Sequence, residues 1–198
     1  MSIFIAGFSL GLSLILAIGS QNAFVLKQGI KNQHVLAVCL VCALSDATLI
    51  ALGVLGFGAI VAQFPQIETF ARYGGAGFLT CYALLSFKSA LTQRHALTTD
   101  NSAKASLAKT VGVCLAFTWL NPHVYLDTVI LLGSISTQYQ PQQLLFGAGA
   151  ITASWVFFFS LGYGAKFLAP LFAKPKAWQV LEGIIGIVML SIALSLLL

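Results

Sequence analysis

The chain has 198 residues, of which 59% are hydrophobic and only 8% are charged, and its mean hydropathy is +0.94. A soluble domain of this length cannot bury so much apolar surface, so the composition indicates an all-α membrane protein with several spans. The net charge of +5 comes from Lys and Arg side chains at the ends of apolar runs, not from a basic face. We therefore expect a lipid bilayer as a partner and no nucleic acid.

Six apolar runs are long enough to cross a bilayer, which takes about 20 residues in a helix. They cover residues 3–26, 35–62, 69–91, 110–134, 143–169 and 179–198. The first run is longer than the apolar part of a signal peptide, and no Lys or Arg precedes it, so we interpret it as an uncleaved span. We expect one transmembrane domain, 1–198, in which a polar linker at 92–109 separates two repeats at about 1–91 and 110–198.

Nine of the ten basic residues lie in or beside the odd-numbered loops. Those loops are therefore predicted to be cytoplasmic, with both chain ends on the other side if all six runs span. Three spans followed by three spans gives two halves of opposite orientation, the inverted-repeat plan of many secondary transporters. A shift of 109 residues matches four pairs of small residues between the halves: Ser45 with Ser154, Gly53 with Gly162, Gly74 with Gly183, and Gly77 with Gly186. The last two pairs predict close helix packing.

Polar residues interrupt the first and the fourth runs. The first contains Gly19-Ser20-Gln21-Asn22, and the fourth contains Asn121-Pro122. Pro122 removes one helical hydrogen bond and disfavours helical geometry at Asn121. Interruptions at corresponding positions of two halves indicate a binding site between them, although a kink that only helps packing is an alternative.

Two carboxylates, Asp46 and Asp127, lie well inside predicted spans. Each costs a few kcal/mol at the centre of a bilayer unless it is paired, hydrated or protonated. An acid at this depth is a functional-site candidate, and the alternative is a structural carboxylate bonded to a neighbouring hydroxyl or backbone group.

Other chemically distinctive residues carry weaker signals, and we expect no metal and no cofactor. His123 has no Cys or carboxylate at metal spacing, so we interpret it as a packed imidazole. Glu182, near the start of the last run, suits snorkelling or a helix dipole as well as a functional role. The four scattered cysteines are interpreted as small apolar residues: Cys39, Cys42, Cys81 and Cys114.

Four stretches, in order along the chain, resemble the LysE family of amino-acid exporters, close to its lysine and arginine exporter branch. They are GSQNAFVLKQG at 19–29, SDA at 45–47, GGAGFL at 74–79 and TWLNPHVYLDT at 118–128. The resemblance implies an oligomeric secondary exporter of L-lysine or L-arginine in the bacterial inner membrane. It singles out six positions for substrate binding or ion coupling: Gln21, Asn22, Asp46, Asn121, Pro122 and Asp127. Ser20 departs from the family pattern, where proline is common, and Lys27 stands where arginine is usual.

We expect Asp46 and Asp127 to hold either a proton or the cationic amino acid, so that export is coupled to proton entry or hydroxide exit. In that case the protein is not an enzyme, and a homodimer is one option for its assembly. An intramembrane thiol-disulfide electron carrier is an alternative, which would need a reactive cysteine in each half. A channel without coupling is a further alternative, distinguished by flux that does not respond to pH.

Overall fold

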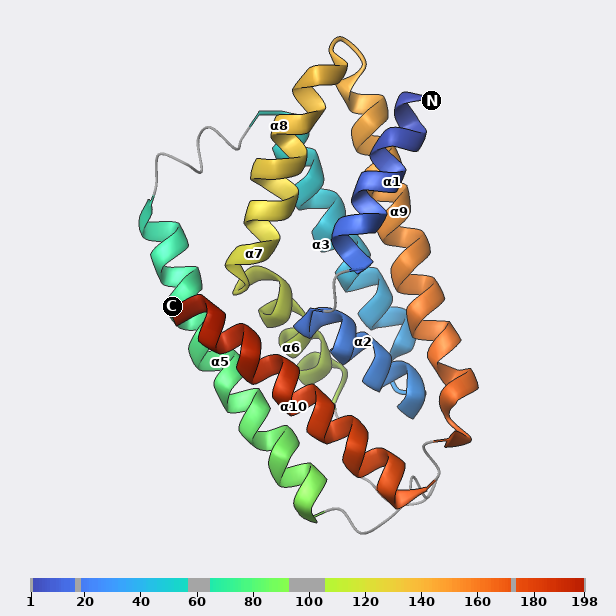
Figure 1. The fold of residues 1–198 in the computed structure, drawn as a ribbon. Helices are drawn as coiled ribbons and strands as arrows, with labels where there is room; N and C mark the ends of the chain where they lie inside the picture. The colour runs from blue at the N-terminus through green and yellow to red at the C-terminus, as the bar shows by residue number, and fades with distance from the viewer. Residues whose placement is uncertain (1, 17–18, 57–64, 93–105, 172–173, 198) are drawn as a thin grey trace.

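The computed structural model describes residues 2–16, 19–56, 65–92, 106–171 and 174–197 (Figure 1). Helices account for nearly all of these residues, and no strand occurs in the described ranges. The all-α prediction is therefore confirmed. Most of the predicted linker at 92–109 and the end of the run at 35–62 lie outside the described residues, so the division at the linker stays a prediction.

The first predicted run is two helices rather than one. Helix α1 is Ile3–Leu16 and helix α2 is Ser20–Lys31, and their axes differ by 80°. Gly19, directly before α2, has an extended backbone with φ −106° and ψ 170°. The polar sequence that follows the break therefore forms the first turn of a new helix.

Apart from the second run, whose helix ends at Val54 and whose last residues lie outside the described ranges, the other helices follow the predicted runs within about five residues, and the fourth run is also divided. Helix α3 is Val35–Val54, α5 is Pro65–Thr92, and α6 is Leu107–Trp119. After the second break come α7 (Pro122–Val124), a π-helix η1 (Tyr125–Leu131), α8 (Leu132–Ser136) and a short 3-10 helix η2 (Thr137–Tyr139). Helix α9 (Gln143–Gly164) continues as the 3-10 helix η3 (Ala165–Leu168), and α10 is Pro175–Leu197.

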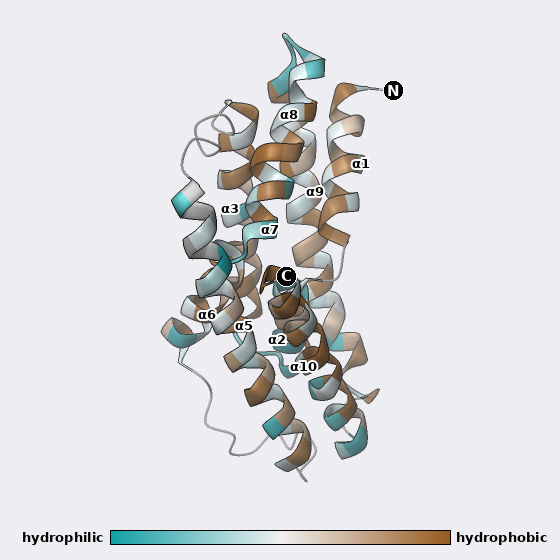
Figure 2. Cartoon of the chain, turned by 60° about the vertical axis from the view of Figure 1, so that its left-hand side comes forward, coloured by the Kyte–Doolittle hydropathy of each residue, from teal (hydrophilic) through white to brown (hydrophobic). Residues whose placement is uncertain are grey.

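Length and hydropathy identify three of the described helical stretches as candidate spans: Val35–Val54, Gln143–Leu168 and Pro175–Leu197. The bent pair α1–α2 passes the same test when it is taken as one broken span. Large apolar side chains such as Leu84, Val156 and Ile187 are exposed, and apolar residues dominate the middle of the helices (Figure 2). The chain is thus a multi-pass membrane protein, and the count of six spans stays a prediction.

The helices pack in two groups. Helix α1 lies along α9, and α3 lies between α9 and the stretch formed by α6, η1 and α8. Helices α5 and α10 pack along each other and run obliquely to α1, α3 and α9 (Figure 1). The half-helix α2 contacts both groups, because it packs against α9 and also against α10.

Two glycine pairs bring backbones into contact across the halves. A Cβ atom on Gly29 of α2 would overlap the carbonyl oxygen of Gly162 on α9. In the other half, a Cβ atom on Gly133 of α8 would overlap the carbonyl oxygen of Gly53 on α3. Each half-helix beyond a break is therefore held against a long helix of the other half by a close glycine contact.

The predicted close packing is wrong for three of the four glycines on α5 and α10. No described atom lies within 4 Å of a Cβ placed on Gly74, Gly77 or Gly183. Gly186 does meet a neighbour, the ring of Phe87. The two helices meet at Phe87 against Gly186 and at Gly75 near Leu196, and the buried residues Ala76, Leu79 and Ala83 of α5 share a hydrophobic cluster with Ile185 and Met189 of α10.

Candidate functional site

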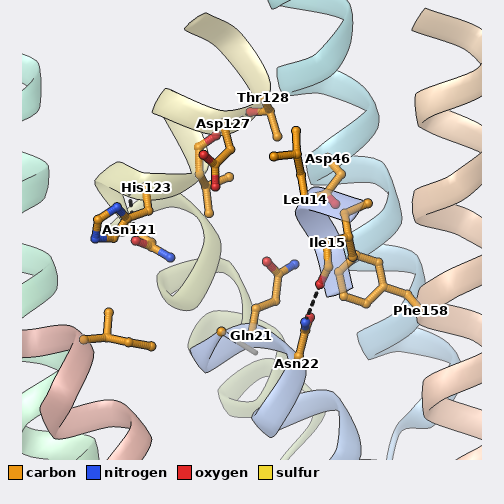
Figure 3. A pocket seen from close by; sticks show the side chains of 13 residues that line it. Leu14, Ile15, Gln21, Asn22, Asp46, Asn121, His123, Asp127, Thr128 and Phe158 are labelled. Atoms are coloured by element: carbon orange, nitrogen blue, oxygen red, sulfur yellow. Dashed lines mark hydrogen bonds between the residues drawn. The ribbon is translucent and has the colours of Figure 1, made fainter. Parts of the chain in front are cut away.

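A cavity of about 260 Å³ lies where the two breaks meet (Figure 3). Its walls come from both halves of the chain, with residues from α1, α2, α3, α7, η1, α9 and α10. Of the six residues singled out from the sequence, five line it: Gln21, Asn22, Asp46, Asn121 and Asp127. Pro122 is buried and is not among the lining residues.

The start of α2 forms one wall of the cavity. A helix leaves its first backbone N–H groups without partners inside the helix, and Gly19, Gln21 and Asn22 at this start all line the cavity. The Asn22 Nδ2 atom donates to the Ile15 carbonyl at 2.7 Å, which ties the start of α2 to the end of α1. Asn22 therefore stabilises the break as well as facing the cavity.

Gln21 extends from α2 into the space between Asp46 and Asp127 (Figure 3). Its side chain is buried, and its Nε2 atom makes no hydrogen bond of normal geometry with the described residues. A buried donor without an acceptor costs free energy, so this amide is suited to an acceptor group that a ligand brings.

The start of α7 forms the opposite wall. Asn121 has φ −100° and ψ 107°, the extended geometry expected of a residue before proline, and its Oδ1 atom accepts from the His123 N–H at 3.2 Å. Pro122 occupies the first helical position, where a missing N–H leaves no intrahelical bond unmade. This proline therefore starts the second half-helix. The predicted helix break at Asn121-Pro122 is confirmed.

Aromatic side chains brace this second break. The Tyr125 hydroxyl donates to the Trp119 carbonyl at 2.8 Å and so satisfies one carbonyl at the end of α6. The Trp119 indole N–H donates to Ser45 Oγ at 3.2 Å, which links the end of α6 to α3 one residue before Asp46. The Tyr125 bond thus spans the break beside the Asp127 segment, and the Trp119 bond fixes the end of α6 beside Asp46.

The two carboxylates have different surroundings. Asp46 is 4% exposed and accepts a hydrogen bond from Ser154 Oγ to its Oδ2 atom at 2.9 Å. Asp127 is partly exposed and lies in the π-helix η1, a wide helical form that often occurs at functional sites. One hydrogen bond offsets only part of the cost of an ionised carboxylate inside a membrane, so burial of Asp46 in its charged form remains costly.

The sequence did not identify every residue of the site. Ser154 lies 108 residues from its partner Asp46, and the sequence suggested only its repeat pairing with Ser45. The interpretation of His123 as a packed imidazole is wrong, because this residue is exposed and lines the cavity. Among the described residues, no group of three or more His, Cys, Asp or Glu side chains could hold a metal ion.

The cysteines of the two halves meet away from solvent. The Cys42 and Cys114 sulfur atoms are 3.3 Å apart, and the Cys39 thiol donates to the Phe158 carbonyl at 3.2 Å. All three residues are 0% exposed. Thiol-disulfide exchange needs a thiolate that a reaction partner can reach, and this burial does not provide it.

Comparison with known proteins identifies the family. The model of the family described as LysE type translocator matches residues 12–198. The chain belongs to the LysE type translocator family. Its relatives in this family include arginine exporter protein ArgO of Serratia proteamaculans, 41% identical over 99% of this chain and 96% of the relative. ArgO of Salmonella enteritidis is 40% identical over 99% of this chain and 93% of the relative.

A Mycobacterium tuberculosis relative with the provisional name of amino-acid transporter is 44% identical over 94% of this chain and 92% of the relative. No solved structure matches the chain. Family membership confirms the resemblance that the four sequence stretches predicted, and three of these stretches contribute the polar residues of the cavity.

Proposed function

We propose that this LysE-family protein exports basic amino acids, arginine and lysine, across the bacterial inner membrane in exchange for protons. The observation that carries the proposal is the meeting of Asp46 and Asp127 in one cavity at two broken helices. Two acids in a cavity of about 260 Å³ suit a small cationic substrate. The ArgO relatives, named arginine exporters, support the same substrate class.

The polar groups of the cavity divide according to the charges of an amino acid. Asp46 and Asp127 bind its two positive groups, the side-chain cation and the α-ammonium. The N–H groups at the start of α2 and the buried amide of Gln21 bind its α-carboxylate, because a helix N-terminus favours negative charge. Broken helices hold charged substrates in this way in other secondary transporters.

Coupling follows from charge balance at a carboxylate. On the cytoplasmic side, a protonated carboxyl group releases its proton and binds the cationic amino acid. On the outer side, the cation leaves and a proton takes its place. One positive charge leaves the cell for each one that enters, so the membrane potential, about 2.3 kcal/mol per charge per 100 mV, does not oppose the cycle.

An inverted repeat gives this cycle a structural basis. Both halves contain a broken helix whose second part begins at the cavity. Gly53 and Gly162, which the shift of 109 residues pairs, each receive a close glycine contact from the half-helix of the other half, Gly133 and Gly29, and this arrangement is compatible with the repeat. We propose that the two halves exchange conformations, which exposes the cavity to each side in turn.

Transport by the purified protein in proteoliposomes tests the proposal. The expected result is uptake of radiolabelled arginine. Its rate should increase when a pH gradient drives protons across the membrane in the opposite direction. Citrulline has nearly the shape of arginine without its charge, so it should neither be transported nor compete. Arginine flux that ignores the pH gradient would support the channel alternative instead, and absence of arginine flux would refute the proposed function.

A further inference from the structure

A buried ion pair lies outside the cavity and connects α2 with α10. The Lys27 Nζ atom is 2.7 Å from Glu182 Oε1 and 2.8 Å from Oε2. The side chain of Glu182 is 1% exposed and that of Lys27 is 13% exposed. The snorkelling interpretation of Glu182 is therefore wrong, since this carboxylate is buried and held by one ammonium group with both oxygens.

The pair lies between the cavity and the predicted cytoplasmic end of the helices. Lys27 follows the cavity residue Asn22 by five positions, which is about 8 Å along a helix. Glu182 precedes the cavity residue Ile192 by ten positions, which is about 15 Å. Both helices continue from the pair to ends that carry basic residues, Lys31 on α2 and Lys176 on α10.

An aromatic cluster fills the space beside the pair. The rings of Phe24, Phe78, Tyr82 and Phe117 contact one another with centroid distances of 4.9 to 6.4 Å. Phe24 and Phe117 are 4% and 1% exposed. The cluster joins α2, α5 and α6, and the ion pair joins α2 and α10, so together they hold α2 in place beyond its cavity residues.

We propose that the Lys27–Glu182 ion pair is an inner gate of the transport path, and that a cationic amino acid opens it by replacing Lys27 as the partner of Glu182. This inference rests on the proposed function. The Lys27 ammonium lies over the ring of Tyr82, 5.5 Å from its centroid, with the carboxylate on another side. A carboxylate beside an aromatic face binds ammonium and guanidinium groups in general, so the side chain of a free lysine or arginine fits where that of Lys27 lies.

The position of α2 connects this gate to the cavity. The same 12-residue helix carries Gln21 and Asn22 at its start and Lys27 beyond its middle. When Lys27 leaves Glu182, the contact of α2 with α10 loses its charge pair, and α2 can move with its cavity residues. A neutral amino acid has no side-chain cation, and its α-ammonium comes with an α-carboxylate that Glu182 repels, so the gate also selects for cationic substrates.

Accessibility of the cavity from the cytoplasmic face tests the gate. A cysteine reporter at Ile192 in a Cys81→Ala background is labelled with a membrane-impermeant maleimide in inside-out vesicles. Breaking the pair with Lys27→Met should raise the labelling rate about tenfold, the factor given by about 1.4 kcal/mol of lost closure energy. Lys176→Met is the matched control, because it removes an equal charge from an exposed position at the same end of α10, and it should leave the rate unchanged.

Arginine should accelerate labelling of the chain with an intact pair, whereas citrulline should not. Glu182→Gln should label fast and no longer respond to arginine. The exchange Lys27→Glu with Glu182→Lys keeps the pair and should restore slow labelling, which separates gating from misfolding. The gate proposal is overturned if Lys27→Met labels at the unmodified rate, or if arginine accelerates Glu182→Gln equally. Failure of the proposed function is seen separately, as absence of arginine uptake by the unmodified protein.

Discussion

Replacing Asp46 with asparagine tests the role of the buried carboxylate most directly. The amide has nearly the same size and still offers an oxygen to Ser154 Oγ, which donates to Asp46 at 2.9 Å. Only the negative charge and the exchangeable proton are lost. At a separation of about 4 Å and an effective dielectric constant of about 20, one ion pair with the substrate contributes about 4 kcal/mol. Allowing for the hydration that arginine gives up, we expect export to fall at least about 100-fold, the equivalent of 2.7 kcal/mol.

The control for this variant is Ser154→Ala, which keeps the charge of Asp46 and removes only its hydrogen bond. Ser154 can donate to Asp46 whether the carboxyl group holds a proton or the substrate, so loss of this bond should reduce export less than Asp46→Asn does if the charge is essential. Thermal unfolding in detergent checks that both variants remain folded.

The assay is arginine uptake by everted membrane vesicles whose lumen has been acidified. In this orientation protons leave the lumen as arginine enters it, which corresponds to export in the cell. We expect Asp127→Asn to be as severe as Asp46→Asn. If both asparagine variants retain uptake driven by the pH gradient, the carboxylates do not exchange protons for substrate and the coupling scheme is wrong.

Three further predictions concern the framework of the cavity. Gly29→Ala should lower stability by about 1–3 kcal/mol because its Cβ overlaps a carbonyl of α9, whereas Gly74→Ala, with open space around it, should not; thermal unfolding measures both. Replacing Cys42 and Cys114 with alanine together should preserve arginine export, and its loss in a folded variant would favour the electron-carrier alternative. Asn22→Ala should reduce export about tenfold or more in the vesicle assay, because it frees the start of α2 from α1 through loss of a 2.7 Å hydrogen bond.

Local chemistry made much of the site predictable from the sequence. A residue before proline avoids helical geometry wherever it lies, so the break at Asn121 needed no knowledge of its neighbours. The cost of an intramembrane acid likewise marks Asp46 and Asp127 without any structure. These two signals identified three of the residues that line the cavity, Asn121, Asp46 and Asp127, whereas Gln21 and Asn22 came from the polar interruption of the first run and from the family resemblance.

Contacts between distant segments were not predictable in the same way. Lys27 and Glu182 are 155 residues apart, and each alone has the sequence context of a charge near a membrane surface. The glycines at 74 and 77 failed as a packing signal because spacing within one helix does not say which face meets the partner. The residues of α5 that are buried instead are Ala76, Leu79 and Ala83, which follow a helical spacing and share a hydrophobic cluster with Ile185 and Met189 of α10.

The two charge sites of the chain constrain each other through α2. If Asp46 holds a proton while Lys27 is bound to Glu182, the two acids that are almost fully buried, Asp46 and Glu182, are both neutralised in the closed state. Entry of one cationic amino acid disturbs this balance first at Glu182, where it frees the ammonium of Lys27, and then at the cavity, where it can stay only if a proton leaves. A substrate without a side-chain cation can replace neither Lys27 at Glu182 nor the proton at the cavity. Mutating Glu182 should therefore relax selectivity against neutral amino acids as well as open the gate, and competition by citrulline against arginine in Glu182→Gln, compared with Lys176→Met, measures that change.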